Sequence, residues 1–239
     1  MVSGDNINMH ILLHKIHNSI TSSVYYTFTM SLVFFLFGFL LSSITSHVSA
    51  RDFCVADLKS SLTTVGYACK LPKDVTVEDF LFSNFKVGPP NQFNFSTISA
   101  TVDNFPALNG LGFSLARAEL EEGATVPLHT HPDATEVVIA GSGPGKYTTG
   151  FITSDNVVYI KTLSEGDIFV IPKGLLHFGI NSGKGKSVGL GVFSSENPSI
   201  EVLDLALFGN NLDSAILQKT TFLDIEQIKK LKTFFKGSG

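Results

Sequence analysis

The pattern of apolar and polar positions divides the 239-residue chain into regions of different period. Residues 1–50 contain one continuous apolar run, MSLVFFLFGFLLSSI at positions 30–44. From about residue 92 to 207, apolar residues alternate with polar ones or gather in short β-branched and aromatic segments. In the tail, apolar positions recur at helical spacing. The pattern predicts a β domain between two different flanking segments.

Ten short segments of the central region are predicted strands. Turns that contain Gly, Pro or Asp separate them at intervals of roughly 8 to 12 residues, which is typical of an antiparallel sandwich or barrel. The segments are FNFSTISATV, GFSLARAEL, TVPLHTH, TEVVIA, YTTGFI, VVYIKTL, DIFVIP, LLHFGI, SVGLGVF and IEVLDLALF. We expect a single all-β domain over residues 91–208.

The tail, residues 209–239, is predicted to be helical. Ile225, Ile228, Leu231 and Phe235 recur at helical spacing, and Asp224 is placed to cap the N-terminus of that helix. A helix of barely three turns is marginal alone, so it must pack on the barrel or on a neighbouring subunit.

Composition supports a β core and argues against one class of partner. Apolar residues make up 44% of the chain and charged residues 16%, and the 21 Phe far outnumber the 5 Tyr, which fits a well-filled β core. The formal net charge is −4 and Lys and Arg form no block. These features argue against nucleic acid as a partner.

The first 50 residues predict a secretory signal peptide. The apolar run suits a signal-peptide core and is short for a membrane span, which needs about 20 residues. Val48 and Ala50 satisfy the small-residue rule for cleavage before Arg51, which would leave a secreted chain without a membrane span. Two alternatives stay open: translation starts at Met9 or Met30, or the run extends back to Val24 and serves as an uncleaved anchor.

Residues 51–90 are turn-rich and predict an extension in front of the barrel. Cys54 and Cys69 are the two cysteines of the chain, so in an oxidising compartment they can pair in one way. Closing a loop of about 15 residues would stabilise the fold by roughly 3 kcal/mol. The alternative is two buried free thiols. The sequon NFS makes Asn94 a candidate glycosylation site, whereas NPS at Asn197 is blocked by its proline.

Four residues form a candidate metal site. Residues i and i+2 of a strand share a face, so His129 and His131 can converge inside a barrel, and Glu136 opens the next strand. His177, about 40 residues downstream, can lie opposite them. Three imidazoles and one carboxylate suit Mn²⁺, Fe²⁺, Cu²⁺, Ni²⁺ or Zn²⁺. Taken singly, His177 would more often be a hydrogen-bonded histidine and Glu136 a solvent-facing strand residue; the joint pattern favours a metal.

These motifs resemble the two boxes of the germin-like proteins, a branch of the cupin superfamily. The first box is formed by Gly123, the HTH of residues 129–131, Glu136 and Gly143. The second is formed by Gly166, Pro172, Gly174, His177 and Asn181. The segments DFCVADL, GYAC and NPSIEVLDLALFGNN extend the resemblance over nearly the whole mature chain. Within the family the chain resembles the auxin-binding-protein-like, subfamily 3 type.

The resemblance implies a jelly-roll β-barrel with a Mn ion on the three histidines and Glu136. It also implies a homohexamer built as a trimer of dimers, located in the plant apoplast or cell wall. Gly123, Gly166, Pro172, Gly174 and Asn181 are then structural residues of the motif.

Two enzymatic activities are associated with this family, oxalate oxidase and superoxide dismutase. The oxalate oxidases bind substrate through two asparagines, and the matching positions here are Ala116 and Val126. Neither side chain can donate a hydrogen bond, so oxalate oxidation is not expected. We expect a secreted Mn protein with superoxide dismutase activity. The alternatives are a module that binds a small anion or auxin-like carboxylate, and a structural or defence-related cell-wall protein.

The chain departs from the family pattern after Glu136. The segment VVIAGSGPGKYTTGFI contains Gly141, Gly143, Pro144 and Gly145, and Gly and Pro weaken a strand interior. We expect the strand to end near Ala140 and a longer loop to follow. The match of Gly143 to the box is then a coincidence.

Overall fold

The computed structural model describes residues 30–37, 52–63 and 66–239. Residues up to Asp52 and those from Phe53 onward are two separate compact units. Residues 30–37 are helical, and the predicted cleavage site after Ala50 lies outside the described residues. In the part of the chain that is described, no helix has the length and apolar character to cross a membrane.

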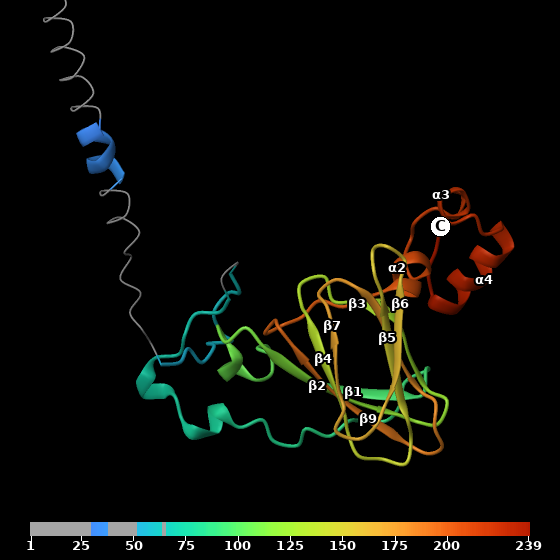
Figure 1. The fold of residues 1–239 in the computed structure, drawn as a ribbon, viewed down its shortest axis with the longest axis horizontal. Coiled ribbons are helices and arrows are strands. Elements are labelled where there is room, and N and C mark those ends of the chain that lie inside the picture. Colours follow the sequence, from blue (N-terminus) through green and yellow to red (C-terminus); the bar gives the residue numbers. More distant parts are fainter. Residues whose placement is uncertain (1–29, 38–51, 64–65) are drawn as a thin grey trace, which may run out of the picture. The chain divides into compact units, whose positions relative to one another are not determined.

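The second unit contains two five-stranded antiparallel sheets, which form a jelly-roll barrel (Figure 1). The first sheet has the order β1 (Phe95–Ala100), β2 (Ser114–Leu120), β9 (Ser187–Phe193), β4 (Glu136–Ala140), β7 (Ile168–Ile171). The second has the order β10 (Glu201–Val202), β3 (Thr125–Thr130), β8 (Leu176–Asn181), β5 (Tyr147–Ile152), β6 (Val158–Leu163). The predicted all-β cupin fold is therefore confirmed.

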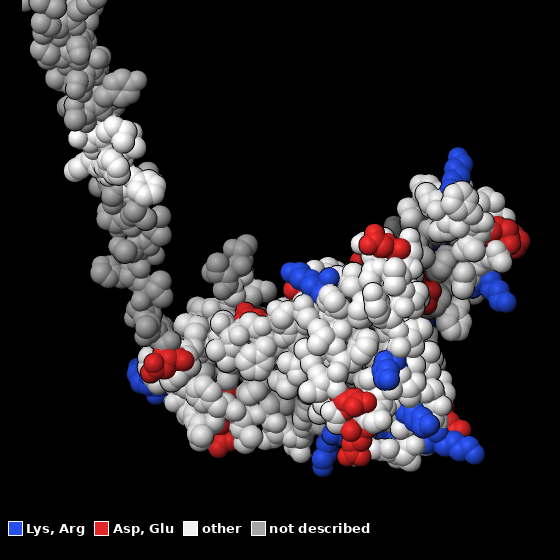
Figure 2. Space-filling model, in the orientation of Figure 1, with Lys and Arg blue, Asp and Glu red and all other residues white. Residues whose placement is uncertain are grey.

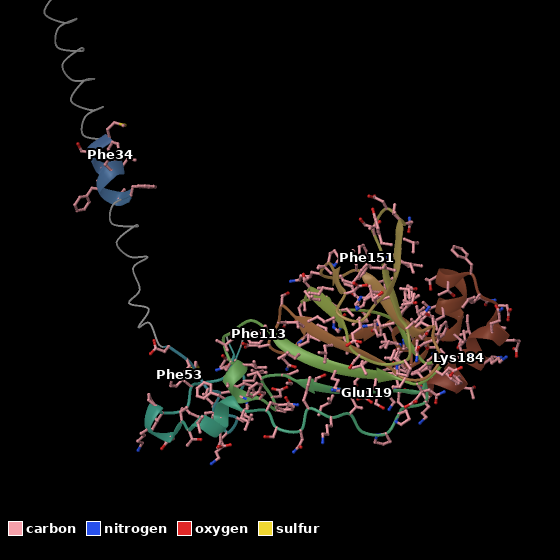
Figure 3. All side chains as sticks on the ribbon, turned by 60° about the horizontal axis from the view of Figure 1, so that its bottom comes forward. Phe34, Phe53, Phe113, Glu119, Phe151 and Lys184 are labelled. Carbon is pink, nitrogen blue, oxygen red and sulfur yellow. A yellow bond between two sulfur atoms is a disulfide. The ribbon has the colours of Figure 1, made fainter. Side chains whose placement is uncertain are left out.

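Period-two patterning explains how the sheets pack. Along β8 and β9 buried and half-buried residues alternate strictly, as expected when one face of a strand points into the barrel. Side chains from both sheets fill the space between them (Figure 3). The buried core of the barrel consists of Leu120, Ala124, Val138, Ala140, Tyr147, Leu163 and Ile171.

The structure confirms that the strand opened by Glu136 ends at Ala140 and that a loop follows it. Strand β4 ends at that residue, and residues 141–146 form the loop. The loop lies against the turn between β8 and β9, where Gly145 N donates to Lys186 O at 3.0 Å. A Cβ atom at Gly143 would lie 2.7 Å from the same carbonyl oxygen, so this close approach requires glycine there.

Residues 53–94 precede the first strand and contain two 3₁₀ helices, η1 (Pro72–Asp74) and η2 (Val77–Phe80). Cys54 and Cys69 form the predicted disulfide. Val55 and Ala56 beside it are fully buried, and Ala56 N donates to Pro106 O in the segment that connects β1 and β2, which contains η3 (Pro106–Leu108). Asn94 is exposed, and its glycosylation stays a prediction.

The C-terminal segment contains three helices, α2 (Leu203–Phe208), α3 (Ser214–Thr221) and α4 (Ile225–Phe235). The predicted cap is confirmed, because the Asp224 side chain accepts a hydrogen bond from Gln227 N. Phe208, Leu217 and Ile228 form a small core of their own, and α2 contacts β3 (Figure 1). This packing supplies the partner that a short helix requires.

The expected strand IEVLDLALF is wrong over most of its length. Only Glu201 and Val202 pair with β3, as β10, and α2 begins at Leu203. The segment combines alternating β-branched residues with helix-forming Leu and Ala, so period alone does not separate the two states. Burial of Phe208 against the other helices favours the helix.

Asn181 hydrogen-bonds to several connections at one end of the barrel. Its side chain is 2% exposed. Nδ2 donates to the carbonyls of Leu120, Glu121 and Gly185, and Oδ1 accepts from Lys146 N and Gly183 N. These carbonyls and amides belong to three separate connections between strands. The one side chain therefore provides hydrogen-bond partners to all three connections.

We predict that Asn181→Ala lowers the free energy of unfolding by about 3 kcal/mol or more, because several buried backbone groups lose their partner. Chemical denaturation measures the change. Asn104→Ala is the matched control, since Asn104 also hydrogen-bonds the backbone but is exposed. Equal, small effects of the two substitutions would contradict a structural role for Asn181.

Candidate metal centre

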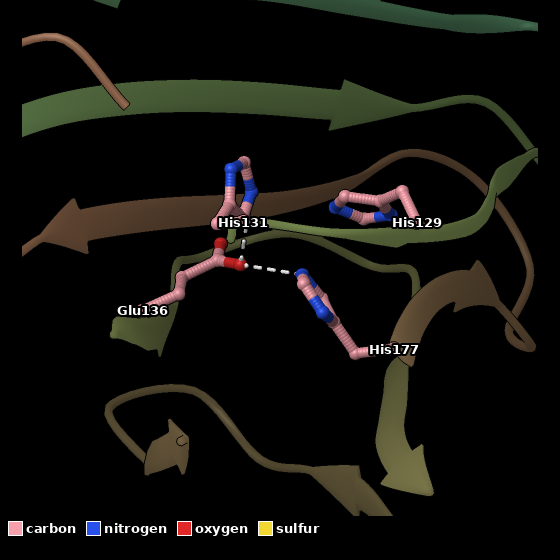
Figure 4. A group of neighbouring side chains, drawn as sticks. All are labelled: His129, His131, Glu136 and His177. Carbon is pink, nitrogen blue, oxygen red and sulfur yellow. Dashed lines mark ion pairs between the residues drawn. The ribbon is translucent and has the colours of Figure 1, made fainter. Parts of the chain in front are cut away.

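Four metal-ligand side chains converge between the two sheets (Figure 4). The four, called here the His₃Glu cluster, are His129, His131, Glu136 and His177, and their ligand atoms lie within 4.8 Å of one another. His129 is on β3 and His177 on β8, in one sheet, whereas Glu136 begins β4 in the other sheet. The structure therefore brings together all four predicted ligands across the barrel interior.

A shift of register aligns two of the histidines. His129 pairs directly with His177, but the register between β3 and β8 changes between Val126 and His129. Pro127 lies at this bulge, where a residue without an N–H costs the sheet no hydrogen bond. In the register of Val126, His129 would instead pair with Leu176, which points to the opposite face from His177.

Each imidazole is held by a backbone carbonyl behind it. Nδ1 of His129 lies 2.8 Å from Pro127 O, Nδ1 of His177 2.8 Å from Leu175 O, and Nδ1 of His131 2.6 Å from Ser199 O. A carbonyl can only accept, so each Nδ1 carries the proton and donates. All three Nε2 atoms are then left with a lone pair, in the tautomer that binds a metal.

The contact between His177 and Glu136 requires a positive charge. Nε2 of His177 lies 3.0 Å from Oε2 of Glu136, yet this buried nitrogen has no hydrogen-bond partner among the described residues. Two lone pairs at this separation repel each other unless a cation lies between them. A metal ion bound by both atoms removes the repulsion, so the donor set fits a transition metal.

Burial keeps two of the rings neutral. Burial, with a smaller effect of the neighbouring His177, lowers the pKa of His129 to about 4, and burial also lowers the pKa of His131. Neutral imidazole is the form that binds a metal, so protons do not compete with the ion at these rings near neutral pH.

Asp133 positions His131 through the backbone of Ser199. Its Oδ1 accepts from Ser199 N at 2.8 Å and its Oδ2 from Ser195 Oγ at 3.0 Å. Burial would raise the pKa of Asp133, but these hydrogen bonds outweigh it and lower the pKa. Asp133 lies in the turn that follows the HTH segment. Its role was missed because Ser199 is far away in the sequence.

The cluster lies in a cavity of about 440 Å³ between the sheets. Much of the lining is apolar, including Ala116, Val126, Val138 and Ile171, and Tyr147 also lines it. Ala116 and Val126, the two positions that match the oxalate-binding asparagines, therefore both line the cavity. The cavity is large enough for a small organic ligand.

Comparison with known proteins agrees with this geometry. A model of the cupin family matches residues 85–229. Auxin-binding protein ABP19b of Prunus persica is 46% identical over 208 residues, which cover 86% of this chain and 98% of the relative. A germin-like protein of Morus alba is 43% identical over 209 residues, 87% of this chain and 98% of the relative. The chain belongs to the germin-like proteins of the cupin family.

Solved structures resemble this germin-like protein over most of the barrel. Recombinant oxalate oxidase in complex with glycolate has 34% sequence identity and a TM-score of 0.72, and the match covers 77% of this chain and 95% of that one. Peruvianin-I, described as a cysteine peptidase from Thevetia peruviana latex, has 38% identity and a TM-score of 0.60, with 64% of this chain and 94% of that one covered.

The three glycines predicted from the germin boxes as structural residues lie at turns between strands. Gly123, Gly166 and Gly174 all have positive φ, which explains glycine at these positions. Gly174 N donates to His131 O at 3.1 Å, so the turn that follows Pro172 is bonded to the HTH segment. Gly174 thereby joins the HTH segment to the connection that precedes His177.

We predict that Asp133→Ala weakens metal binding by roughly 10- to 100-fold, because His131 loses the support that fixes its ring. Competition with a chromogenic chelator measures the affinity. Asp155→Ala, in an exposed turn between β5 and β6, is the control and should leave the affinity unchanged. Equal affinities of the two variants would show that Ser199 holds His131 without help from Asp133.

Proposed function

We propose that this germin-like protein binds a divalent transition metal, Mn²⁺ foremost, in the His₃Glu cluster and dismutates superoxide. The observation that carries the proposal is the convergence of three Nε2 lone pairs on the half-buried Glu136 carboxylate. The set holds no thiolate, which disfavours closed structural zinc sites of the cysteine type. Fe, Cu and Zn are the alternatives to Mn within the same ligand set.

Superoxide dismutation requires few protein groups beyond those of this site. A bound redox metal would supply the exchange of one electron in each half of the reaction. The protein residues fix the ligands, keep the imidazoles neutral and exclude bulk water with an apolar wall. The cavity remains open enough for a small anion to enter.

Oxalate oxidation is not proposed, although the oxalate oxidase structure is similar. Ala116 and Val126 line the cavity and cannot hydrogen-bond a carboxylate. A site that recognises a buried dicarboxylate without such donors would lose several kcal/mol of binding.

A second candidate function is the binding of a small carboxylate with an apolar body. The apolar lining beside the His₃Glu cluster favours it, because a metal can hold the carboxylate while the wall holds the remainder. The similarity to relatives named auxin-binding proteins supports an indole carboxylate as the first ligand to test.

We further propose that the chain is secreted and self-associates, as a hexamer. The disulfide supports an oxidising compartment such as the apoplast. Val158 and Ile160 on β6, and Ile168 and Val170 on β7, are between 53% and 65% exposed on the edge strands of the two sheets. Figure 2 shows broad uncharged areas among scattered charges of both signs. Exposed apolar side chains on open sheet edges favour an interface between copies.

For the enzymatic function, we predict that Mn-loaded protein dismutates superoxide and that His177→Ala abolishes both the activity and the bound metal. Loss of a ligand that binds only the folded state should also remove about 3 kcal/mol of stability when free metal is about 100 times its Kd. Metal analysis, a superoxide assay and thermal unfolding measure the three effects.

Metal-stripped wild-type protein, before and after reloading, is the control for this experiment. Loaded protein without dismutase activity would reject the catalytic proposal. If His177→Ala then still lowered the melting temperature, the metal would have a structural role, as in a wall protein without catalysis.

For assembly, we predict that the wild-type chain sediments as an oligomer and that Ile160→Lys with Ile168→Lys dissociates it, because buried charge opposes the interface. Sedimentation velocity measures the size. Ser164→Lys, at an exposed position between the two strands, serves as the charge control. A wild-type monomer at micromolar concentration would contradict the proposal.

A further inference from the structure

Tyr147 places a hydroxyl group in the cavity of the His₃Glu cluster. It begins β5, directly after the loop of residues 141–146, and its side chain is only 9% exposed. It lines the same cavity as all four residues of the cluster. Nothing in the metal chemistry described above uses it.

Two glycines, one on β8 and one on β9 in the other sheet, make the space for this ring. A Cβ atom at Gly189 would lie 3.1 Å from Cε2 of Tyr147, and one at Gly179 would lie 2.5 Å from its hydroxyl oxygen. Neither glycine has positive φ, so the backbone conformation does not demand glycine there. The ring of Tyr147 explains the glycines at these two positions, since any larger residue would displace it.

The same contacts locate the hydroxyl next to the cluster. Gly179 is two residues beyond His177 on β8, and residues with this spacing share a face about 6.6 Å apart. The hydroxyl lies over Gly179, so it stands one same-face position from His177. The negative charge of Glu136 adds to the effect of burial in raising the pKa of Tyr147, which agrees with this proximity.

The Tyr147 hydroxyl is available to hydrogen-bond a ligand in the cavity. It makes no hydrogen bond to any residue that the structure describes, whereas Thr149, the next inward residue of β5, donates to Phe178 O. A phenol that keeps its proton is a donor, and donors inside proteins are usually paired. A donor beside a metal site and without a protein partner indicates an acceptor on the ligand.

We propose that Tyr147 is a ligand-binding residue of this cavity, whose hydroxyl donates a hydrogen bond to one oxygen of a small carboxylate held at the His₃Glu cluster. The proposal rests on the metal site and on the carboxylate-binding function proposed above. A carboxylate has two oxygens, so one can face the cluster while the other faces Tyr147. Val126, which lies close to Gly179, offers an apolar surface to the body of the same ligand.

The test compares Tyr147→Phe with wild-type protein, both loaded with Mn²⁺, by calorimetry with indole-3-acetate. The variant removes one hydroxyl and keeps the ring, so we expect equal metal content, an unchanged or higher melting temperature and about tenfold or greater loss of affinity. Indole-3-acetamide, which lacks the charge, should bind both proteins weakly and equally. Tyr159→Phe, at an exposed tyrosine of β6, is the matched control.

Gly179→Ala gives an independent reading, because the added methyl group displaces the hydroxyl without deleting it. We expect it to weaken indole-3-acetate binding as Tyr147→Phe does. Equal affinity of wild type and Tyr147→Phe would overturn the role of Tyr147 while leaving the carboxylate site intact. Failure of Mn-loaded wild type to bind the probe would reject the carboxylate function and this inference with it, whereas failure to retain Mn²⁺ would reject the metal site itself.

Discussion

Three backbone carbonyls force the imidazoles of the His₃Glu cluster to point their Nε2 lone pairs at one another and at Glu136. This arrangement is unfavourable by itself, because the buried Nε2 of His177 faces the Glu136 carboxylate without a donor between them. A protein can maintain it only if the surrounding fold fixes each ring and a cation compensates the repulsion. The site is therefore preorganised at a cost to the metal-free fold, and the barrel must be rigid enough to bear that cost.

The fold provides this rigidity because the four side chains come from strands that are hydrogen-bonded or directly connected to one another. The bulge at Pro127 sets His129 opposite His177, and the chain then crosses from one sheet to the other before Glu136. Asp133 lies within that crossing and fixes the backbone that holds His131. The HTH segment thus supplies two of the predicted ligands and leads directly into the connection between the sheets.

The sequence predicted most of the strands and the histidine pair from short-range regularities, whereas Glu136 and His177 were predicted from their joint pattern with that pair and from the resemblance to the germin boxes. Alternation over five to seven residues marks a strand, and a histidine pair two residues apart marks one face of it. The sequence could not show the roles of Asp133 and Tyr147, since each depends on a partner brought near by sheet pairing. The error at Leu203 has the same origin, because contacts with distant helices, rather than local period, decide that the segment is helical.

Two glycines of strand β9 leave space for side chains of the site. Its sequence SVGLGVF places Gly189 and Gly191 on the buried face, where a Cβ atom at Gly191 would lie 2.9 Å from Oε1 of Glu136. One glycine therefore admits the metal-ligand carboxylate and the other admits the ring of Tyr147. A strand interior weakened by two glycines is a cost to the sheet, and here the space gained receives two polar side chains that line the cavity, Glu136 and Tyr147.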